Sequence, residues 1–150
     1  QQTSLNKLVA AVTPFENLPD IMDQQTFITT YQTFTSNAMV VRKLIQRFQV
    51  PALEDIIKNE DENKFYQRQI VRPIKLRVTK LLKVIVDTAV SEFTPETIMS
   101  LKIFIYGIAD SDFAKILAKS LDKGVRVGNI QSNSMMKNYF CYAFNCDRYL

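Results

Sequence analysis

The strongest constraint in the sequence is an apolar periodicity that runs from about residue 63 to residue 91. Apolar residues recur there every three or four positions, at Tyr66, Ile70, Ile74, Val78, Leu81, Ile85 and Ala89. This spacing is typical of one buried face of an α-helix, here over about eight turns. Pro73 lies inside the run and has no backbone N–H, so we expect a kink or a restart there, with helical pieces over 63–72 and 74–91.

A second stretch, TFITTYQTFTS at residues 26–36, gives conflicting local indications. Its threonine and aromatic residues favour a strand. Phe27, Tyr31 and Phe34, however, lie at i, i+4 and i+7, which is the spacing of one helical face. We interpret the stretch as helical, with Asp23 as its candidate N-cap and the three aromatic side chains in the core rather than around a ligand.

Cap and proline signals predict the other helices. A first helix over residues 5–12 stops before Pro14, and Ser36 precedes another whose apolar face runs to Phe48. Residues 54–62 are acidic and predict a loop or a frayed turn. Further along, a helix begins after Thr94 with Pro95 at its first position, and Ser111 caps one that extends to Gly124 as a candidate C-cap.

These elements predict an all-α protein, an irregular orthogonal bundle of about six helices around the long helix over residues 63–91. A chain of 150 residues suffices for one core. We expect residues 1–124 to form this domain, and residues 125–150 to be a linker or an additional helix packed on it. The chain begins with Gln and shows no secretory leader, so we expect a fragment of a longer protein.

The composition argues against an enzyme. The sequence has no histidine, which excludes Ser-His-Asp and Cys-His sites and every zinc site that needs histidine. Cys141 and Cys146 are too few for a four-ligand zinc site, and we favour a buried reduced pair over a disulfide. Three glycines build neither a P-loop nor a dinucleotide fingerprint. We therefore expect no catalytic residue, metal or cofactor, and no run approaches the roughly 20 apolar residues that span a bilayer.

Residues 64–83 contain seven basic side chains and no acidic one: Lys64, Arg68, Arg72, Lys75, Arg77, Lys80 and Lys83. Most lie opposite the apolar face, so they form a basic stripe that is either a solvated helix face or a contact for anionic lipid. The net charge of +4 is modest for a nucleic-acid binder, and we expect none bound. Leu76 beside Arg77 lies off the apolar face, a composition typical of protein-binding sites, although a lone surface leucine is the default interpretation.

The order of four segments resembles a known family. TFITTYQTF, KLIQRFQVP, PIKLRVTKLLKVIVDTAVSEF and LKIFI together are similar to the Ras exchanger motif, the N-terminal helical domain of guanine nucleotide exchange factors for Ras-like GTPases. The similarity runs from about Leu5 to Leu121 and includes the family's Phe-x-Val-Pro signature at Phe48, Val50 and Pro51. The resemblance implies that the threonine-rich stretch is helical.

The resemblance also implies an accessory role. In such exchange factors a separate catalytic domain opens the GTPase, and the motif packs against that domain and steadies its helical hairpin. In the son-of-sevenless branch the motif also binds a second Ras, and its Leu-Arg pair matches Leu76 and Arg77. A tryptophan of that branch aligns near Ile116, so the resemblance implies a third contact at Ile116, without the aromatic anchor.

The expected function is therefore a non-catalytic regulatory and structural module of a Ras-type exchange factor. Its expected partners are the catalytic exchange domain of the same parent chain and a Ras-like GTPase. The alternative is a helical adaptor that binds anionic membrane lipid through the basic stripe. We expect the protein in the cytoplasm, with weak contact to the inner membrane surface.

Overall fold

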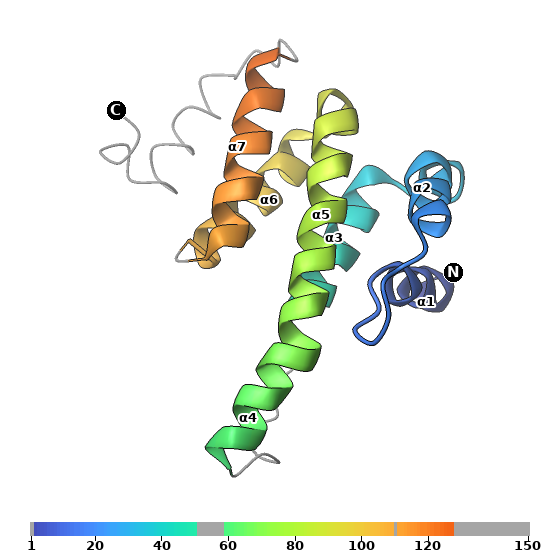
Figure 1. Ribbon diagram of the computed structural model, residues 1–150. Coiled ribbons are helices and arrows are strands. Elements are labelled where there is room, and N and C mark those ends of the chain that lie inside the picture. Colours follow the sequence, from blue (N-terminus) through green and yellow to red (C-terminus); the bar gives the residue numbers. More distant parts are fainter. Residues whose placement is uncertain (1, 51–58, 110, 128–150) are drawn as a thin grey trace. The chain divides into compact units, whose positions relative to one another are not determined.

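The computed structural model describes residues 2–50, 59–109 and 111–127, and each regular element in these ranges is helical (Figure 1). The α-helices are α1 (Gln2–Val12), α2 (Ile21–Thr30), α3 (Asn37–Phe48), α4 (Glu60–Tyr66), α5 (Arg72–Ala89), α6 (Pro95–Gly107) and α7 (Asp112–Val127). Short 3-10 turns, η1 (Tyr31–Thr33) and η3 (Val90–Glu92), follow α2 and α5, and a π-helical turn, η2 (Gln67–Val71), joins α4 to α5. The all-α prediction is confirmed, and so is the number of about six helices, because α4, η2 and α5 form one continuous run in the described chain.

The long helix accommodates its proline through the π-helical turn. The Arg72 N–H donates to the carbonyl of Gln67, five residues earlier, immediately before Pro73. Proline cannot donate to the preceding turn and its ring crowds that turn, so a wider turn relieves the helix without ending it. Of the two alternatives predicted at Pro73, the restart is wrong, because the helical run is continuous and contains a π turn over residues 67–71.

The long helix also begins earlier than its apolar pattern indicates. Asn59 accepts a hydrogen bond from the Asp61 N–H at 2.9 Å, and Glu60, Asp61 and Glu62 form the first turn of α4. Three carboxylates there complement the positive end of the helix dipole. The acidic residues predicted as a loop therefore belong to the helix from Glu60 onward, while residues 54–58 lie outside the described part.

The threonine-rich stretch is helical, as predicted. Its threonine hydroxyl groups donate hydrogen bonds to backbone carbonyls of the preceding turn, for example from Thr30 to the Thr26 carbonyl at 2.6 Å. The N-cap of α2 is Asp20, whose Oδ1 accepts from the Met22 N–H at 2.8 Å, and the predicted cap Asp23 lies in the first turn instead. The prediction errs by one turn because both aspartates precede apolar positions.

The aromatic residues of this stretch are only partly in the core. Phe27 and Tyr31 are buried, with ring centroids 6.1 Å apart, whereas Phe34 is 50% exposed. The 3-10 turn η1 lies between Tyr31 and Phe34 and has three residues per turn, so the helical spacing assumed for Phe34 is lost. Ser36 then caps α3 by accepting from the Met39 N–H, as predicted.

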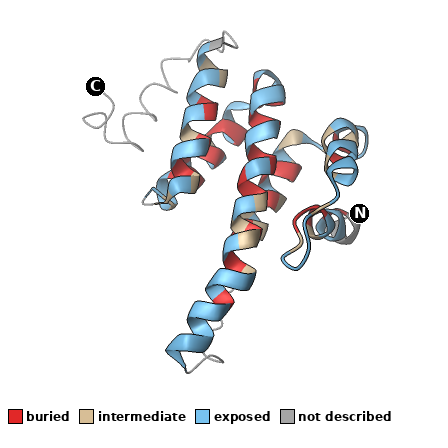
Figure 2. Ribbon diagram, in the orientation of Figure 1, coloured by how far each residue is buried: buried red, intermediate tan, exposed pale blue. Residues whose placement is uncertain are grey.

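The chain divides into two compact units after Leu82, within α5. Figure 2 shows the buried positions of α5 as interrupted bands along the helix, in keeping with the predicted apolar face. The first unit, residues 1–82, contains a core to which α1, α2 with η1, α3 and the first part of α5 contribute. Its buried residues include Val9, Phe27, Val40, Val41, Leu44, Phe48, Ile74 and Val78.

The second unit contains the end of α5, η3, α6 and α7. Thr94 caps α6 and Pro95 begins it, as predicted, and the Ser111 hydroxyl accepts from the Ala114 N–H at the start of α7. Its core includes Ile85, Val86, Ile98, Leu101, Leu117 and Leu121. The described parts of both units are thus organised around apolar faces that the sequence periodicity indicates.

Gly124 is not a C-cap, because α7 continues to Val127. A Cβ atom on Gly124 would lie 2.5 Å from Cγ1 of Val90 in η3, so the glycine permits a close approach of the two elements. The helix therefore crosses the predicted domain boundary after residue 124. Asp110 and residues 128–150, with both cysteines, lie outside the described residues.

Candidate protein-binding groove

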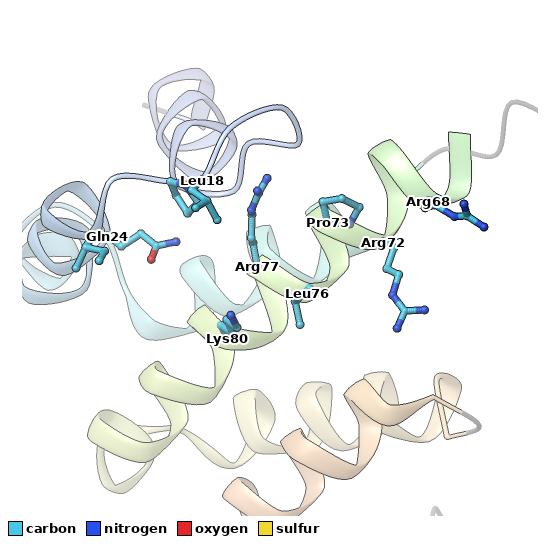
Figure 3. Close-up of a pocket in the computed structure, with 10 residues that line it drawn as sticks. Leu18, Gln24, Arg68, Arg72, Pro73, Leu76, Arg77 and Lys80 are labelled. Carbon is cyan, nitrogen blue, oxygen red and sulfur yellow. The ribbon is translucent and has the colours of Figure 1, made fainter. Parts of the chain in front are cut away.

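A groove with a volume of about 530 Å³ lies in the first unit, between the segment 18–24 and the helical run 68–80 (Figure 3). Its lining is apolar and basic: Leu18, Pro19, Ile21, Gln24, Arg68, Arg72, Pro73, Leu76, Arg77 and Lys80. The volume falls within the range of ligand and peptide sites, and none of the lining residues carries a negative charge.

One wall of the groove is held by hydrogen bonds that close the end of α1. The buried Thr13 hydroxyl donates to the Val9 carbonyl at 2.6 Å, and Arg47 from α3 donates to the Thr13 carbonyl at 3.0 Å and to its hydroxyl at 3.1 Å. The Gln24 amide donates to the Val12 carbonyl at 3.0 Å. Because these bonds satisfy carbonyls that a helix end leaves open, they fix where the chain leaves α1 and where α2 begins.

Burial of Arg47 has an electrostatic consequence. Desolvation lowers its pKa from the ordinary value of an arginine. The guanidinium remains a donor at neutral pH, because arginine starts from a pKa far above this range. Arg47 therefore acts in the support of the groove wall and is not part of its lining.

The opposite wall is the π turn and the start of α5. Figure 3 shows Arg77 extending from α5 toward the segment that carries Leu18, while Arg72 projects away from that segment. The positive groups are thus spread along the helix instead of meeting at one point. This arrangement suits contact with an extended surface better than enclosure of a single small anion.

Arg77 carries the most specific polar feature of the groove. Its Nη1 atom is buried and has no hydrogen-bond partner among the described residues. A buried donor without a partner typically costs about 1–3 kcal/mol, more when it is charged. An acceptor from outside the chain would satisfy this donor once the side chains that cover it move aside.

Apolar side chains of the groove are unusually exposed. Leu18 is 89%, Ile21 70% and Leu76 41% exposed. Large apolar side chains next to arginine are the composition of protein-binding surfaces, in which apolar contact gives affinity and the guanidinium gives direction. The site is suited to binding a protein surface, because its side chains offer cationic donors rather than a nucleophile and a base.

The structure brings together most, but not all, of the predicted site residues. Arg68, Arg72, Leu76, Arg77 and Lys80 all line the groove. These placements leave the predicted roles of Leu76 and Arg77 as predictions, because they describe where the side chains lie and not what they bind.

Three members of the basic stripe have other neighbours. Lys64 forms an ion pair with Glu60 at 2.8 Å, and Lys83 forms one with Asp87 at 2.6 Å. The Lys75 Nζ lies 5.0 Å from the centroid of the Phe48 ring. The predicted contact Ile116 lies in the second unit, on α7, and is 40% exposed.

The sequence reasoning missed the 18–24 wall. Leu18, Pro19 and Ile21 belong to no extended helical periodicity, and no cap or charge pattern marks them as a surface. The available signal was the presence of large apolar residues between the predicted helix that stops before Pro14 and the threonine-rich stretch, in a connection where polar residues are the norm.

Two titratable groups of the second unit have shifted pKa values. Partial burial of Asp87 opposes its ionisation, but hydrogen bonds from Lys83 and Ser120, with the charges of Lys83 and Lys123, lower its pKa overall. Lys102 in α6 is 3% exposed, and burial lowers its pKa to about 8, which the charge of Asp122 partly opposes. Lys102 lies in the interior, and Asp87 is bonded to Lys83 and Ser120 of its own unit, so neither residue lines the groove.

The described part of the chain has neither a metal-binding cluster nor a membrane-spanning helix. No group of three or more acidic, cysteine or histidine side chains there is placed to hold a metal ion. None of the helices described is both long and apolar enough to cross a membrane.

This chain is similar in sequence to known guanine nucleotide exchange factors. Ras guanine nucleotide exchange factor I of Dictyostelium discoideum is 32% identical over 126 residues, which are 82% of this chain and 14% of that protein. Ras guanine nucleotide exchange factor J of the same organism is 33% identical over 131 residues, 82% of this chain and 15% of that protein. This chain thus spans about one seventh of the length of these two relatives.

The family match covers the groove completely. The RasGEF N-terminal motif matches residues 1–104, which include the 18–24 segment, the π turn and α5. That motif is an accessory part of exchange factors and not their catalytic domain. The order of helices and the extent of this match lead to one conclusion: the chain belongs to the family of the RasGEF N-terminal motif.

Proposed function

We propose that this chain is a non-catalytic regulatory module that stabilises the separate catalytic domain of a Ras-type exchange factor and contacts a Ras-like GTPase. The observation that carries the proposal is the placement of Leu76 and Arg77, in a chain of this family, in a groove with exposed apolar and basic side chains. Such a surface loses solvent contact when a partner binds, and burial of its apolar area favours association.

A nucleotide-release assay tests the proposal. Release from a panel of Ras-like GTPases is measured with residues 1–150, with a longer protein that includes an exchange domain, and with that protein carrying Leu76→Glu and Arg77→Ala. We expect the short chain to be inactive, the longer protein to be active, and the double variant to lose at least about ten-fold in rate, since interface contacts of this kind each contribute about 1–2 kcal/mol.

A matched control separates binding from general damage. Leu8 on α1 is 39% exposed, close to the 41% of Leu76, and Arg42 on α3 is exposed outside the groove. The longer protein with Leu8→Glu and Arg42→Ala should release nucleotide at the parental rate. Equal loss in both double variants, or full activity in the Leu76 and Arg77 variant, would refute a role of the groove.

A further inference from the structure

We propose that the groove binds a short extended segment of a partner protein in which carboxylates alternate with apolar side chains. One carboxylate would accept from the guanidinium of Arg77, and an apolar side chain would lie against Leu18, Ile21 and Leu76. This inference rests on the proposed function, because it specifies the chemistry of the partner surface that the groove recognises.

The charge of the groove is the first argument. Arg68, Arg72, Arg77 and Lys80 line it, no carboxylate does, and none of the four forms an ion pair within the described chain. The neighbouring cations differ, because Lys64 and Lys83 are paired with Glu60 and Asp87. The groove thus carries four positive charges that no carboxylate of its lining offsets, and the complementary ligand is acidic.

The direction of Arg77 is the second argument. Its side chain points toward the segment that carries Leu18, and the buried Nη1 has no partner among the described residues (Figure 3). A carboxylate is the protein group that matches guanidinium geometry, since two oxygens can face two N–H donors. A neutral carbonyl could accept one bond but would leave the charge uncompensated.

The length of the groove favours an extended segment. Residues 68 and 80 are twelve positions apart, which corresponds to about 18 Å along a helix axis. About six residues of extended chain span that distance, and their side chains alternate in direction. An alternating segment can thus present carboxylates to the cations and apolar groups to Leu18 and Ile21.

A bilayer fits the same surface less well. Ile21 and the exposed Met22 are flanked by Asp20 and Asp23, both exposed. Asp20 is held in place as the cap of α2. A flat anionic membrane in contact with Ile21 would bring these two carboxylates against negatively charged headgroups, which is unfavourable. A narrow segment that lies inside the groove avoids them.

Fluorescence anisotropy with residues 1–150 tests the inference. The probe is a fluorescein-labelled peptide Glu-Leu-Glu-Val-Glu-Asp, and the matched peptides replace every acidic residue by its amide or both apolar residues by serine. We expect each replacement, and Arg77→Gln in the protein, to weaken binding at least about ten-fold, with further weakening at high salt. Arg42→Gln, an exposed arginine outside the groove, should leave binding unchanged.

The outcomes are decisive in either direction. Arg77→Lys keeps the charge without the paired donors, so binding between that of the parent and that of Arg77→Gln supports carboxylate recognition. Equal binding of the acid and amide peptides overturns the inference. Charge-dependent binding to vesicles with phosphatidylserine that requires Arg68 and Arg72, without peptide binding, also overturns it in favour of lipid.

Failure of the inference and failure of the proposed function are distinguishable. If Leu76→Glu with Arg77→Ala slows nucleotide release but the protein shows no preference for acidic peptides, the function stands and the inference fails. If the acidic peptide binds and the double variant releases nucleotide normally, the groove recognises an acidic segment of another partner and the proposed function fails.

Discussion

In the first unit, Arg68, Arg72 and Lys80 are exposed in the groove and form no ion pair within the described chain, whereas Lys83 and Lys102 of the second unit are bonded or buried. Lys83 contacts Asp87, and Lys102 is 3% exposed. Both kinds of cation occur along one helix, α5, within a few residues of each other. The comparison shows that a run of positive charge in the sequence can contain residues with two different uses.

The two kinds of cation differ because only some of them have an acidic side chain within reach. Asp87 is one turn beyond Lys83 and also accepts from Ser120 of α7 at 2.7 Å, so it connects two helices of the second unit. The groove cations have no acidic residue among their lining neighbours. Charges with internal partners contribute to folding, and charges without them remain available to a ligand.

The largest expected effect concerns the buried cation. Burial lowers the pKa of Lys102 to about 8, below the ordinary 10.5, so the charged form is disfavoured in the folded protein. The unfolded chain binds more protons between these values, and the free energy of unfolding therefore rises as pH increases from about 8 to 10.5. Lys102→Met should remove this rise and stabilise the protein at pH 7 by about 3 kcal/mol.

Urea denaturation of both proteins across pH 7–10.5 measures the effect. The informative quantity is the difference in unfolding free energy, because tyrosines and other lysines titrate in both. That difference should shrink toward high pH. A difference that stays constant with pH would show that Lys102 is not desolvated in the folded state.

Helix boundaries illustrate what local sequence can predict. The caps at Ser36 and Thr94 were found because each depends on residues within one turn. Gly124 was misread because its role depends on Val90, 34 positions away, and glycine at a helix end has the same sequence signature as glycine at a close contact. Local chemistry therefore predicts where helices begin better than how closely they pack.

The second prediction tests that close contact. Gly124→Ala would gain about 1 kcal/mol of helix propensity, but its Cβ would lie 2.5 Å from Val90 Cγ1, and overpacking of this kind costs about 1–3 kcal/mol. We expect net destabilisation in thermal unfolding. In a protein that already carries Val90→Ala, adding Gly124→Ala should cause a smaller further loss of stability than it does in the parent protein.

Gly107→Ala provides the matched control. Gly107 ends α6, and no atom lies within 4 Å of a Cβ built on it, so alanine there should be neutral or stabilising. If Gly124→Ala were as stabilising as Gly107→Ala, the contact with Val90 would relax at little cost, and the glycine would not be required by packing.

The groove shows that local sequence predicts a functional site only in part, as it does helix packing. Its helical wall could be predicted, because Leu76 and Arg77 lie off the apolar face, and Arg68, Arg72 and Lys80 have no acidic residue within a turn in the sequence. Its other wall could not, because Leu18 and Ile21 approach the helix through the hydrogen bonds of Thr13, Arg47 and Gln24. Those bonds join residues up to 34 positions apart, which no periodicity encodes.

The smallest expected effect compares two lysines on α5. Lys80 is exposed in the groove without an ion pair in the described chain, so Lys80→Ala should change the unfolding free energy by less than about 0.5 kcal/mol. Lys83→Ala breaks a partly exposed pair at i,i+4 and should cost about 0.3–0.5 kcal/mol. Chemical denaturation measures both, and anisotropy with the acidic peptide should respond to Lys80→Ala alone. A loss of stability well above 1 kcal/mol in Lys80→Ala would mean that the side chain serves the fold, and the contrast between available and internally bonded cations would then fail at that position.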